Sequence, residues 1–430
     1  MTQRTFMPRL ETAEELTALQ LEGLKWTVNH AWQGSDYYRS RLDQARVKPE
    51  DIRGLEDLKR LPFTTADDLR AGYPFPLLSV PYDQVVRIHA STGTTGKRKI
   101  LAYTQKDIDD WAHFFARCYE MAGLTAEDRV QIAVGYGLWT AGVGFQAGCE
   151  LFGAMAVPAG PGNLDLQCEL LVDLQSTVIC CTASMGLLLA EEIRRRGLKD
   201  KIHLRRMIYG SERTSPAMRA RIMELLGLED MFDIPGLTEL YGPGTGLECH
   251  HHTGIHYWAD YYIVEIIDPA TLEPVSDGRT GEMVVTTLRK EASPLIRYRT
   301  RDLTRLIPGQ CPCGSILPRH DCLLGRSDDM IIFRAVNIYP GHLDEILSAV
   351  EGVGSEYQVF LDRGEDGRDY MTIKIERAEG RDPSGDMDLA ETVTGRIKKA
   401  LQVTAQIEIV DYGDLPRSER KSKRIFDRRE

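Results

Sequence analysis

The sequence predicts an α/β protein. Its large N-terminal domain combines parallel sheets flanked by helices with a β-rich subdomain, and a small α+β C-terminal domain follows. Helix and strand patterns alternate from about residue 106, β-rich segments begin near residue 260, and a mixed pattern returns after residue 329. The 430 residues exceed what one hydrophobic core usually organises. We therefore expect two domains, at residues 1–327 and 328–430.

The first predicted element is a helix within residues 12–33, where leucines and tryptophans recur at helical spacing, and a polar, loop-rich region follows from Asp36. Repeated alternation of strands and helices then predicts a largely parallel sheet covered on both faces. Ligands of such sheets gather beyond the carboxyl ends of the strands. The helices are expected at 108–119, 164–174, 185–195 and 216–226, and the strands at 130–134, 177–181 and 207–210.

Turn residues separate the later segments, at Asp277-Gly278 and at Pro308-Gly309. Acidic, glycine-containing stretches at 362–369 and 379–388 are expected to be surface loops. Strands are expected at 261–267, 281–288, 303–307, 358–361, 371–375 and 407–410, and helices at 342–350 and 389–401.

The composition is that of an ordinary globular protein, with 42 % hydrophobic and 27 % charged residues. A net charge of −11 argues against a general nucleic-acid binder and against a partner of anionic membranes. The N-terminus lacks an apolar signal core, and no stretch of about eighteen apolar residues occurs, so we expect a cytoplasmic protein. Nine cysteines fit free thiols, and a metal site, better than a disulfide framework.

Residues 91–97 read Ser-Thr-Gly-Thr-Thr-Gly-Lys. Hydroxyls, backbone amides and a cation suit the phosphates of a nucleotide. The segment differs from the Walker pattern, because only two residues separate Gly93 from Gly96 and the Walker spacing needs four. Turns use the same residue types, so the phosphate-binding interpretation depends on further motifs.

Further motifs follow in a fixed order along the chain. They are Gly210-Ser211-Glu212, Gly236-Leu237-Thr238-Glu239, Tyr298-Arg299-Thr300-Arg301-Asp302, Gly325-Arg326-Ser327-Asp328-Asp329 and, in the basic C-terminal stretch, Lys421. In this order they resemble the adenylate-forming superfamily of acyl-CoA synthetases, and most closely the phenylacetate-CoA ligase family. The resemblance covers nearly the whole chain and includes residues 63–65, 89–91, 242–244, 296–303, 328–331 and 337–340.

The resemblance implies ATP-dependent activation of a carboxylic acid to an acyl-AMP, followed by transfer to CoA. Glu239 is expected to bind Mg²⁺, Asp302 to accept hydrogen bonds from the ribose hydroxyls, and Lys421 to act in catalysis beside Thr238. The implied nucleotide-binding residues are Ser91, Thr92, Gly93, Thr94, Thr95, Gly96, Lys97, Gly210, Ser211, Glu212, Asp233, Ile234, Pro235, Gly236, Asp302 and Arg326.

Each of these residues has a structural alternative. Glu239 could be a helix-start carboxylate favoured by the helix dipole. Asp302 could pair on the surface with Arg299 or Arg301. Lys421 lies among several arginines and lysines, and such a run of charge is usually a solvated tail.

The chain departs from the family pattern at three positions. Pro235 stands where an aromatic residue usually packs on adenine, Arg420 stands where glycine usually precedes the catalytic lysine, and Arg98 replaces a common proline. The resemblance also implies a mobile C-terminal domain that swings between two half-reactions. Asp328 matches the hinge of that motion, with an ordinary turn aspartate as the alternative.

The acid is expected to bind beside a glycine- and aromatic-rich stretch that follows a predicted strand. Aromatic walls next to glycines leave a flat slot for a ring, so we expect a phenylacetate-like or benzoate-like acid. Core packing is the alternative for each aromatic residue. The candidate substrate residues are Tyr136, Trp139, Phe145, Ser211, Pro235 and Gly236.

Cys249, His256, Cys311 and Cys313 offer four soft or borderline ligands, which is typical of a structural zinc site. The alternative is a set of free buried thiols. Substitute ligands are His250, His251, His252 and Cys322.

The leading hypothesis is thus an aryl-acid ligase that uses ATP, Mg²⁺ and coenzyme A, with a structural Zn²⁺ and a homodimer implied by the resemblance. A rival enzyme would pass the acyl group to a carrier-protein pantetheine or an amine, and a further relative would adenylylate a cofactor. A non-catalytic nucleotide or acyl-CoA binding module is the alternative from a different class.

Overall fold

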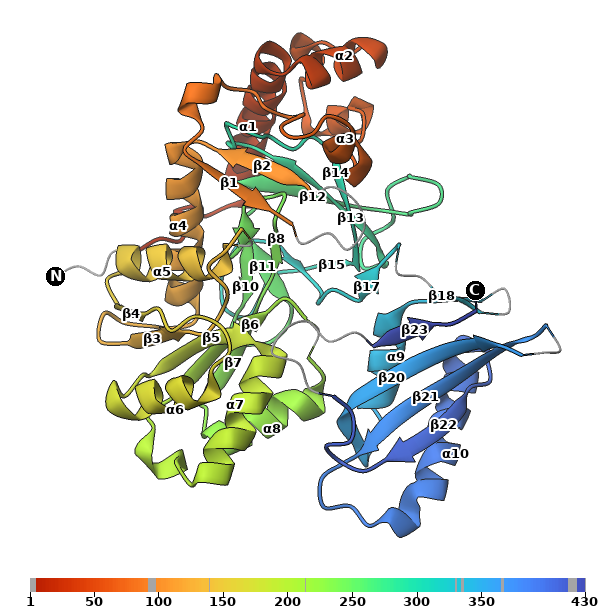
Figure 1. Cartoon of the computed structure of the whole chain (residues 1–430). Coiled ribbons are helices and arrows are strands. Elements are labelled where there is room, and N and C mark those ends of the chain that lie inside the picture. Colours follow the sequence, from red (N-terminus) through yellow and green to blue (C-terminus); the bar gives the residue numbers. More distant parts are fainter. Residues whose placement is uncertain are drawn as a thin grey trace.

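The computed structural model describes residues 5–91, 98–138, 140–212, 214–328, 331–333, 336–364, 367–416 and 424–429. Figure 1 shows a large N-terminal part, drawn from red to green, and a smaller C-terminal part in blue beside its lower end. The first helices are α1 (Ala13–Gly34), α2 (Asp36–Gln44) and α3 (Ala66–Ala71). The expectation of a loop from Asp36 was wrong, because the Ser35 hydroxyl caps a helix that begins there.

A five-stranded parallel sheet lies at the centre of the large part, with strand order β4-β3-β5-β6-β7. One face, with Ile208 and Phe232, packs into a hydrophobic cluster with α4 and α5. The other face, with Met207 and Tyr209, packs with α6, α7 and α8. This confirms the predicted two-sided sheet. The elements are β3 (Arg129–Ile132), β4 (Met155–Val157), β5 (Val178–Thr182), β6 (Arg206–Gly210), β7 (Asp230–Ile234), α4 (Gln105–Met121), α5 (Ala141–Phe152), α6 (Leu164–Asp173), α7 (Ala183–Arg196) and α8 (Pro216–Leu226).

Helix α5 occupies the glycine-rich stretch for which no helix was predicted. Its glycines make room for the aromatic side chains of α4. A Cβ atom at Gly144 would lie 2.3 Å from the Phe115 ring, and one at Gly148 would lie 2.1 Å from Cβ of Phe115. Tertiary packing therefore overrides the low helix propensity of glycine.

Two four-stranded antiparallel sheets form the β-rich part, with orders β12-β13-β14-β17 and β10-β11-β16-β15. The strand expected at 303–307 in fact starts at Tyr298 and is interrupted at Arg305. Short pairs β1-β2 and β8-β9 lie beside these sheets. The bounds are β1 (Arg87–Ala90), β2 (Ile100–Tyr103), β8 (Gly236–Leu237), β9 (Gly242–Pro243), β10 (Gly246–Glu248), β11 (Ile255–Tyr257), β12 (Tyr262–Ile267), β13 (Gly281–Thr287), β14 (Tyr298–Thr304), β15 (Leu306–Ile307), β16 (Arg319–His320) and β17 (Gly325–Arg326).

The C-terminal part has its own hydrophobic cluster, which includes Phe333, Val359 and Val393. The expected loops at 362–369 and 379–388 are partly regular, because the first contributes to a β-hairpin and the second contains the start of a helix. No helix in the described ranges is long and apolar enough to span a membrane. The elements are β18 (Ile331–Phe333), β19 (Val336–Ile338), α9 (Pro340–Ser348), β20 (Val353–Arg363), β21 (Asp369–Arg377), α10 (Asp386–Leu401), β22 (Gln406–Val410) and β23 (Ile425–Asp427).

Candidate active site

Glu239 lies in the turn between β8 and β9, and its side chain is only 2 % exposed. Its carboxylate forms an ion pair with Lys99 and accepts a hydrogen bond of 3.1 Å from the hydroxyl of Tyr298. The residue is not in a helix, so the helix-dipole alternative was wrong. Carboxylate oxygens are suitable ligands for a hard divalent cation, and the Lys99 ammonium supplies the positive charge beside this carboxylate here.

Two predicted nucleotide segments meet at the carboxyl edge of the parallel sheet. Gly210 ends β6 and lies opposite Ile234, which ends β7. A Cβ atom at Gly210 would come within 2.3 Å of the Ile234 carbonyl oxygen, so this close approach requires glycine. Ser211 follows with a φ of +73°, a backbone conformation that few non-glycine residues adopt.

Two carboxyl groups at this edge have different surroundings. Glu212 accepts hydrogen bonds from the backbone N–H and the hydroxyl of Ser184, at 2.6 and 2.7 Å, in the first turn of α7. Asp233 lies at the end of β7. Burial, reinforced by the charge of Glu248, raises the pKa of Asp233 to about 7.

Asp302 and Arg326, which lie in different motifs, face one another across strands β14 and β17. Nη1 of Arg326 lies 3.5 Å from Oδ1 of Asp302. Arg299 and Arg301 instead contact Glu282, at 2.8 and 3.7 Å. Among the described contacts Asp302 pairs with Arg326, and the alternative of a pair with Arg299 or Arg301 has no contact that supports it.

Arg326 also donates two hydrogen bonds to the carboxylate of Asp328, at 2.8 and 2.9 Å. The arginine therefore links a candidate ribose-binding residue to the candidate hinge. Burial would raise the pKa of Asp328, but the hydrogen bonds from Arg326 and its charge outweigh burial and lower it.

Part of the candidate phosphate loop is described. The N–H of Ser91 donates to the carbonyl of Lys99 at 3.1 Å, which closes the base of the loop between β1 and β2. The Ser91 hydroxyl is buried and has no hydrogen-bond partner among the described residues. Several predicted site residues lie outside the described residues, namely Thr92, Gly93, Thr94, Thr95, Gly96, Lys97, Trp139 and Lys421.

The aromatic candidates for the acid site lie in two different environments. Tyr136 is partly buried, and its ring packs so closely on α5 that a Cβ atom at Gly142 would lie 2.5 Å from it. Burial raises the pKa of its phenol to about 12, so the hydroxyl remains protonated. Phe145 is 4 % exposed, and its ring packs 4.6 Å from that of Phe115, so it belongs to the core.

Pro235, Gly236 and Thr238 lie on the turn that leads to Glu239. The carbonyl of Pro235 accepts a hydrogen bond of 3.0 Å from Gly244, and a Cβ atom at Gly236 would lie 2.3 Å from the Pro243 backbone. The Gly242-Pro243-Gly244 motif therefore fixes the backbone of the Gly236 motif. This explains why both motifs contain glycine.

The fold brings Cys249, His256, Cys311 and Cys313 together, with their ligand atoms within 4.8 Å of one another. The sulfur atoms of Cys249 and Cys311 are 3.6 Å apart, and Nε2 of His256 is 3.4 Å from the sulfur of Cys313. Nδ1 of His256 bonds to the carbonyl of Leu317 at 2.9 Å, which leaves Nε2 as the inward-facing atom. Burial lowers the pKa of His256 to about 4, so the imidazole is neutral.

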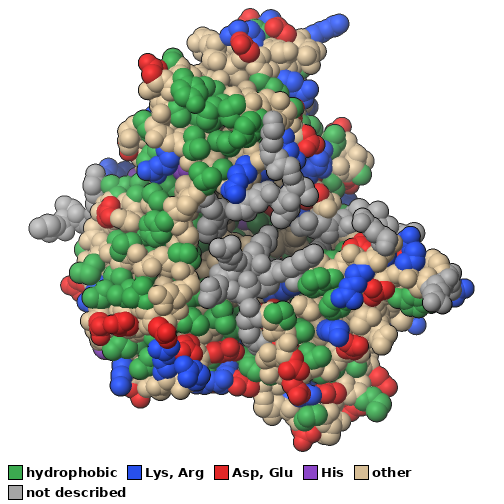
Figure 2. All heavy atoms as spheres, viewed as in Figure 1, with side chains coloured by type: hydrophobic (Ala, Val, Ile, Leu, Met, Phe, Trp, Pro, Cys, Tyr) green, Lys and Arg blue, Asp and Glu red, His purple; other side chains and the backbone are tan. Residues whose placement is uncertain are grey.

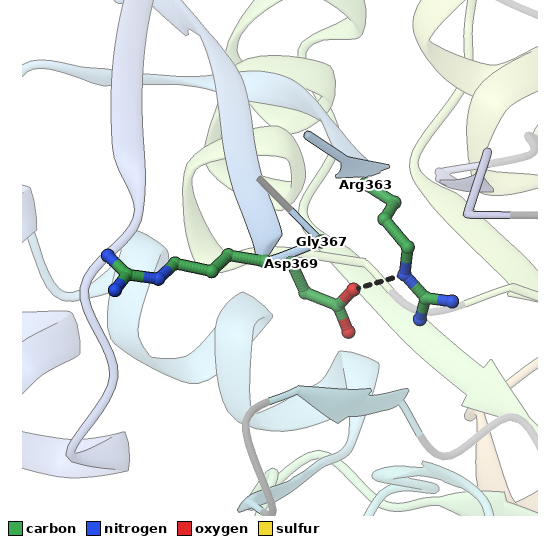
Figure 3. Close-up of a pocket in the computed structure, with 4 residues that line it drawn as sticks. Arg363, Gly367 and Asp369 are labelled. Atoms are coloured by element: carbon green, nitrogen blue, oxygen red, sulfur yellow. Dashed lines mark hydrogen bonds and ion pairs between the residues drawn. The ribbon is translucent and has the colours of Figure 1, made fainter. Parts of the chain in front are cut away.

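An open cavity of about 510 Å³ lies at the tip of the β20–β21 hairpin. Figure 3 shows two of the residues that line it, Arg363 and Asp369, pointing toward one another, and their charged groups are 3.0 Å apart. A second cavity, of about 360 Å³, lies beside α1 and Leu288. None of the motif residues lines either cavity. Figure 2 shows acidic and basic side chains interspersed on the visible face.

Sequence reasoning missed the two groups that contact the Glu239 carboxylate, Lys99 and the Tyr298 hydroxyl. Lys99 lies two residues beyond the predicted phosphate loop and Tyr298 stands at the head of a quoted motif, so both positions were near a signal. The missing information was the contact itself, because 59 residues separate Tyr298 from Glu239.

A sequence profile described as AMP-binding enzyme matches residues 33–288, and one described as AMP-binding enzyme C-terminal domain matches residues 335–429. Together with the fold and the buried Glu239 carboxylate between β8 and β9, this match makes the chain an AMP-binding, adenylate-forming enzyme. The phenylacetate-coenzyme A ligase of Escherichia coli K12 is 41 % identical and covers 100 % of this chain and 99 % of its own. That of Thermus thermophilus is 39 % identical and covers 99 % of both chains. The chain belongs to the phenylacetate-coenzyme A ligase family.

Among solved structures, a 2-hydroxyisobutyryl-CoA ligase in the postadenylation state superimposes with a TM-score of 0.87 at 25 % identity, covering 98 % of this chain and 94 % of that one. The same ligase in the thioesterification state, with 2-HIB-AMP and CoA, gives a TM-score of 0.68 at 27 % identity, covering 97 % and 91 %. The structure described here is therefore more similar to the first of these two states.

Proposed function

We propose that the chain activates an aromatic carboxylic acid with ATP, forming an acyl-AMP and diphosphate, and then transfers the acyl group to CoA with release of AMP. The observation that carries this proposal is the convergence of four motif residues from distant parts of the chain. Tyr298 bonds to Glu239 and experiences the charges of Asp302 and Arg326. The full-length similarity to phenylacetate-coenzyme A ligases supports the aromatic acid and the CoA acceptor.

In this proposal the protein mainly positions and neutralises charge. The Glu239 carboxylate would hold Mg²⁺, and the bound ion would supply positive charge that offsets the charge of the triphosphate. The Lys99 ammonium, which pairs with Glu239 here, lies beside the same site. Asp302 accepts hydrogen bonds from the ribose hydroxyls, and Arg326 orients Asp302. Residues 91–97, 210–212 and 233–236 surround the nucleotide, with Thr238 and Lys421 completing the catalytic set.

We further propose the acid-binding residues Tyr136, Trp139, Ser211, Pro235 and Gly236, with Phe145 supporting the wall from the core. The protonated phenol of Tyr136 and the packed backbone of the Gly236 turn suit the edge and the face of an aryl ring. A phenylacetate-like or benzoate-like acid is the substrate class that this wall favours.

The two half-reactions use two domains in this proposal, at residues 1–327 and 328–430, with Asp328 as the hinge. The separate hydrophobic cluster of the C-terminal part supports the division. The TM-scores of 0.87 and 0.68 against two states of one ligase support a rotation of the small domain. The bond between Arg326 and Asp328 would be one of the contacts that change.

We also propose a structural Zn²⁺ held by Cys249, His256, Cys311 and Cys313. Tetrahedral bonds of about 2.3 Å to sulfur and about 2.0 Å to nitrogen place two sulfurs about 3.8 Å apart and a nitrogen about 3.5 Å from a sulfur. The observed separations of 3.6 and 3.4 Å fit these values. The ion would join the 249–256 segment to the 311–313 turn.

The test of the main proposal is diphosphate release with ATP, Mg²⁺ and a panel of aromatic acids, with and without CoA. Acid-dependent release that CoA accelerates is expected. Release that ignores CoA would point to a carrier-protein pantetheine or another acceptor, and absence of release with every acid would contradict the aryl-acid proposal. Lys421→Ala should abolish acyl-AMP formation while sparing thioester formation from supplied acyl-AMP.

Two further expectations belong to the proposal. A cytoplasmic location suits an enzyme that consumes ATP and CoA, and the family resemblance supports a homodimer. Light scattering during size-exclusion chromatography would decide the second point, because a mass of one 48.4 kDa chain would contradict it.

A further inference from the structure

The side-chain amino group of Lys290 lies in the protein interior, against the backbone of the turn that carries Glu239. Burial lowers its pKa to about 7, although the charges of Asp107 and Glu239 favour the ammonium form. The residue is 0 % exposed, and its Nζ donates a hydrogen bond of 2.9 Å to the backbone carbonyl of Glu239. The rings of Tyr103 and Tyr241 lie 4.4 and 5.3 Å from Nζ. Burial of a charge is costly, and an apolar side chain of similar volume would serve packing better. The cost points to a purpose other than stability.

Tyr103 holds the neighbouring carbonyl of the same turn. Its hydroxyl donates to the carbonyl of Thr238 at 3.0 Å, while its ring covers the Lys290 ammonium. Two consecutive carbonyls of the turn, those of Thr238 and Glu239, are therefore held by side-chain donors.

The backbone beside Lys290 is itself fixed. The buried carboxylate of Asp107, in the first turn of α4, accepts hydrogen bonds from the N–H groups of Glu291 and Ala292 at 2.8 and 2.9 Å. The Thr104 hydroxyl donates to the carboxylate of Glu291 at 2.8 Å. Lys290 thus extends from a backbone that is fixed by hydrogen bonds. The contact between Lys290 and the Glu239 carbonyl, called the tether below, can therefore be precise.

The tether acts on the residue proposed to bind Mg²⁺. A hydrogen bond to the carbonyl of Glu239 restrains its backbone, and the carboxylate can then reach only a small region. A metal ligand must be held within about 0.5 Å of its working position. In its charged form Lys290 also stabilises the buried Glu239 carboxylate, since charge–charge interactions strengthen in a low-dielectric interior.

We propose that Lys290 is a positioning residue for Glu239, holding the carboxylate where Mg²⁺·ATP is bound. Lys290 contacts neither substrate nor metal and acts only through the turn. This inference rests on the proposed role of Glu239, and the experiment separates the two.

The variant Lys290→Met removes the ammonium and keeps most of the side-chain volume. ATP binding is measured by calorimetry in excess Mg²⁺ and in EDTA, so the readout does not depend on turnover. We expect the gain in ATP affinity that Mg²⁺ provides to fall about tenfold, as for loss of one hydrogen bond to a charged group. Affinity in EDTA, and thioester formation from supplied acyl-AMP, should stay unchanged. An unchanged Mg²⁺ dependence would overturn the proposal.

Lys199→Met is the matched control, because Lys199 also donates to a backbone carbonyl, that of Glu224, at 2.7 Å. It should leave the Mg²⁺ dependence unaltered, and an equal loss in the control would also overturn the proposal. Glu239→Gln should lower the Mg²⁺ dependence by itself. If it does not, the metal role of Glu239 is wrong. If Glu239→Gln has the effect and Lys290→Met does not, the positioning role alone is wrong.

The double variant isolates the connection between the two residues. In the Glu239→Gln background Lys290→Met should cause no further loss, whereas an equal loss in both backgrounds would indicate a general structural effect. If Lys290→Met does not fold, Tyr103→Phe removes only the bond to the Thr238 carbonyl. That variant should weaken the Mg²⁺ dependence about threefold, and no change would contradict the proposal.

Discussion

Asp302 and Arg326 lie opposite one another on neighbouring antiparallel strands, although 24 positions separate them in the sequence, and their charged groups approach to 3.5 Å. Arg326 reaches Asp328 as well, so one guanidinium serves a candidate nucleotide ligand and a candidate hinge. A substitution of Asp302 should therefore alter the contact between Arg326 and Asp328, and a substitution of Asp328 should alter the contact between Arg326 and Asp302.

We expect Asp302→Asn to weaken ATP binding about ten- to a hundredfold, because the ribose hydroxyls lose a charged acceptor and Arg326 loses one partner. Titration with ATP would measure the effect. Asp321→Asn is a suitable control, since Asp321 pairs with Arg305 at 2.8 Å outside the motif cluster. Equal affinities for the wild-type protein and Asp302→Asn would remove Asp302 from the nucleotide site.

Ion pairs join the C-terminal part of the chain to the N-terminal part and stabilise the arrangement of the two parts in this structure. Glu379 pairs with Arg194 of α7 at 2.8 Å and with Arg221 of α8. Exposed pairs of this kind contribute about 0.2–1 kcal/mol each. Glu379→Gln should slow acyl-AMP formation about two- to fivefold and spare thioester formation from supplied acyl-AMP.

Stopped-flow measurement of each half-reaction at low ionic strength would show this split. Glu192→Gln is the control, because Glu192 pairs only within α7, with Arg195 and Arg196, among the described contacts. A uniform loss in both half-reactions would contradict the expectation, and so would the same split in the control.

Removal of the proposed zinc should lower stability before it alters nucleotide binding, since the four ligands join two segments, 249–256 and 311–313, that are far apart in the sequence. We expect about one zinc ion per chain by atomic emission. Cys313→Ala should lower the unfolding temperature by about 5 to 10 °C. Cys322→Ala, a cysteine outside the cluster, should change neither quantity. Metal-free protein with unchanged stability would disprove the site.

Asp233 should make stability depend on pH. Its pKa is raised from 3.8 to about 7 in the folded state, so between these values the folded protein binds more protons than the unfolded chain. Stability contributed by this proton is complete below about pH 4 and is lost as the pH rises to about 7. Asp233→Asn should therefore be more stable than wild type by about 1 to 3 kcal/mol near pH 8, and by less near pH 5.

Urea unfolding of both proteins at these two pH values would test the expectation. An identical difference at the two values would show that Asp233 does not titrate in this range.

Much of the fold could be predicted because local signals agree with the final packing. Helix α8 was expected at 216–226, and it forms there because Ser215 caps its start, Pro216 fits its first turn and Gly227 ends it at a φ of +70°. The buried strands of the parallel sheet were visible as apolar runs. Helix α5 was missed because its stability comes from contact between glycines and the aromatic residues of α4, which no local pattern reveals.

The residues of the candidate site could be predicted from the motifs, but the contacts between them could not. The order of the motifs indicated Glu239, Asp302 and Arg326, and the structure brings them near Tyr298. No local sequence pattern indicated Lys290, because its proposed role depends on one contact with a carbonyl 51 residues away. Such a contact depends on the pairing of several sheets and cannot be inferred from spacing.

The glycines of α5 also limit how the chain can change over evolutionary time. At Gly144 and Gly148 even one methyl group would collide with Phe115. A substitution at either glycine would therefore require α4 and α5 to move apart. The ring of Tyr136 packs on a third glycine of the same helix, Gly142, so a change of this side chain would leave the contact between α5 and Phe115 in place. The distance between α4 and α5 would then stay constant while the side chains of the proposed acid-binding wall change.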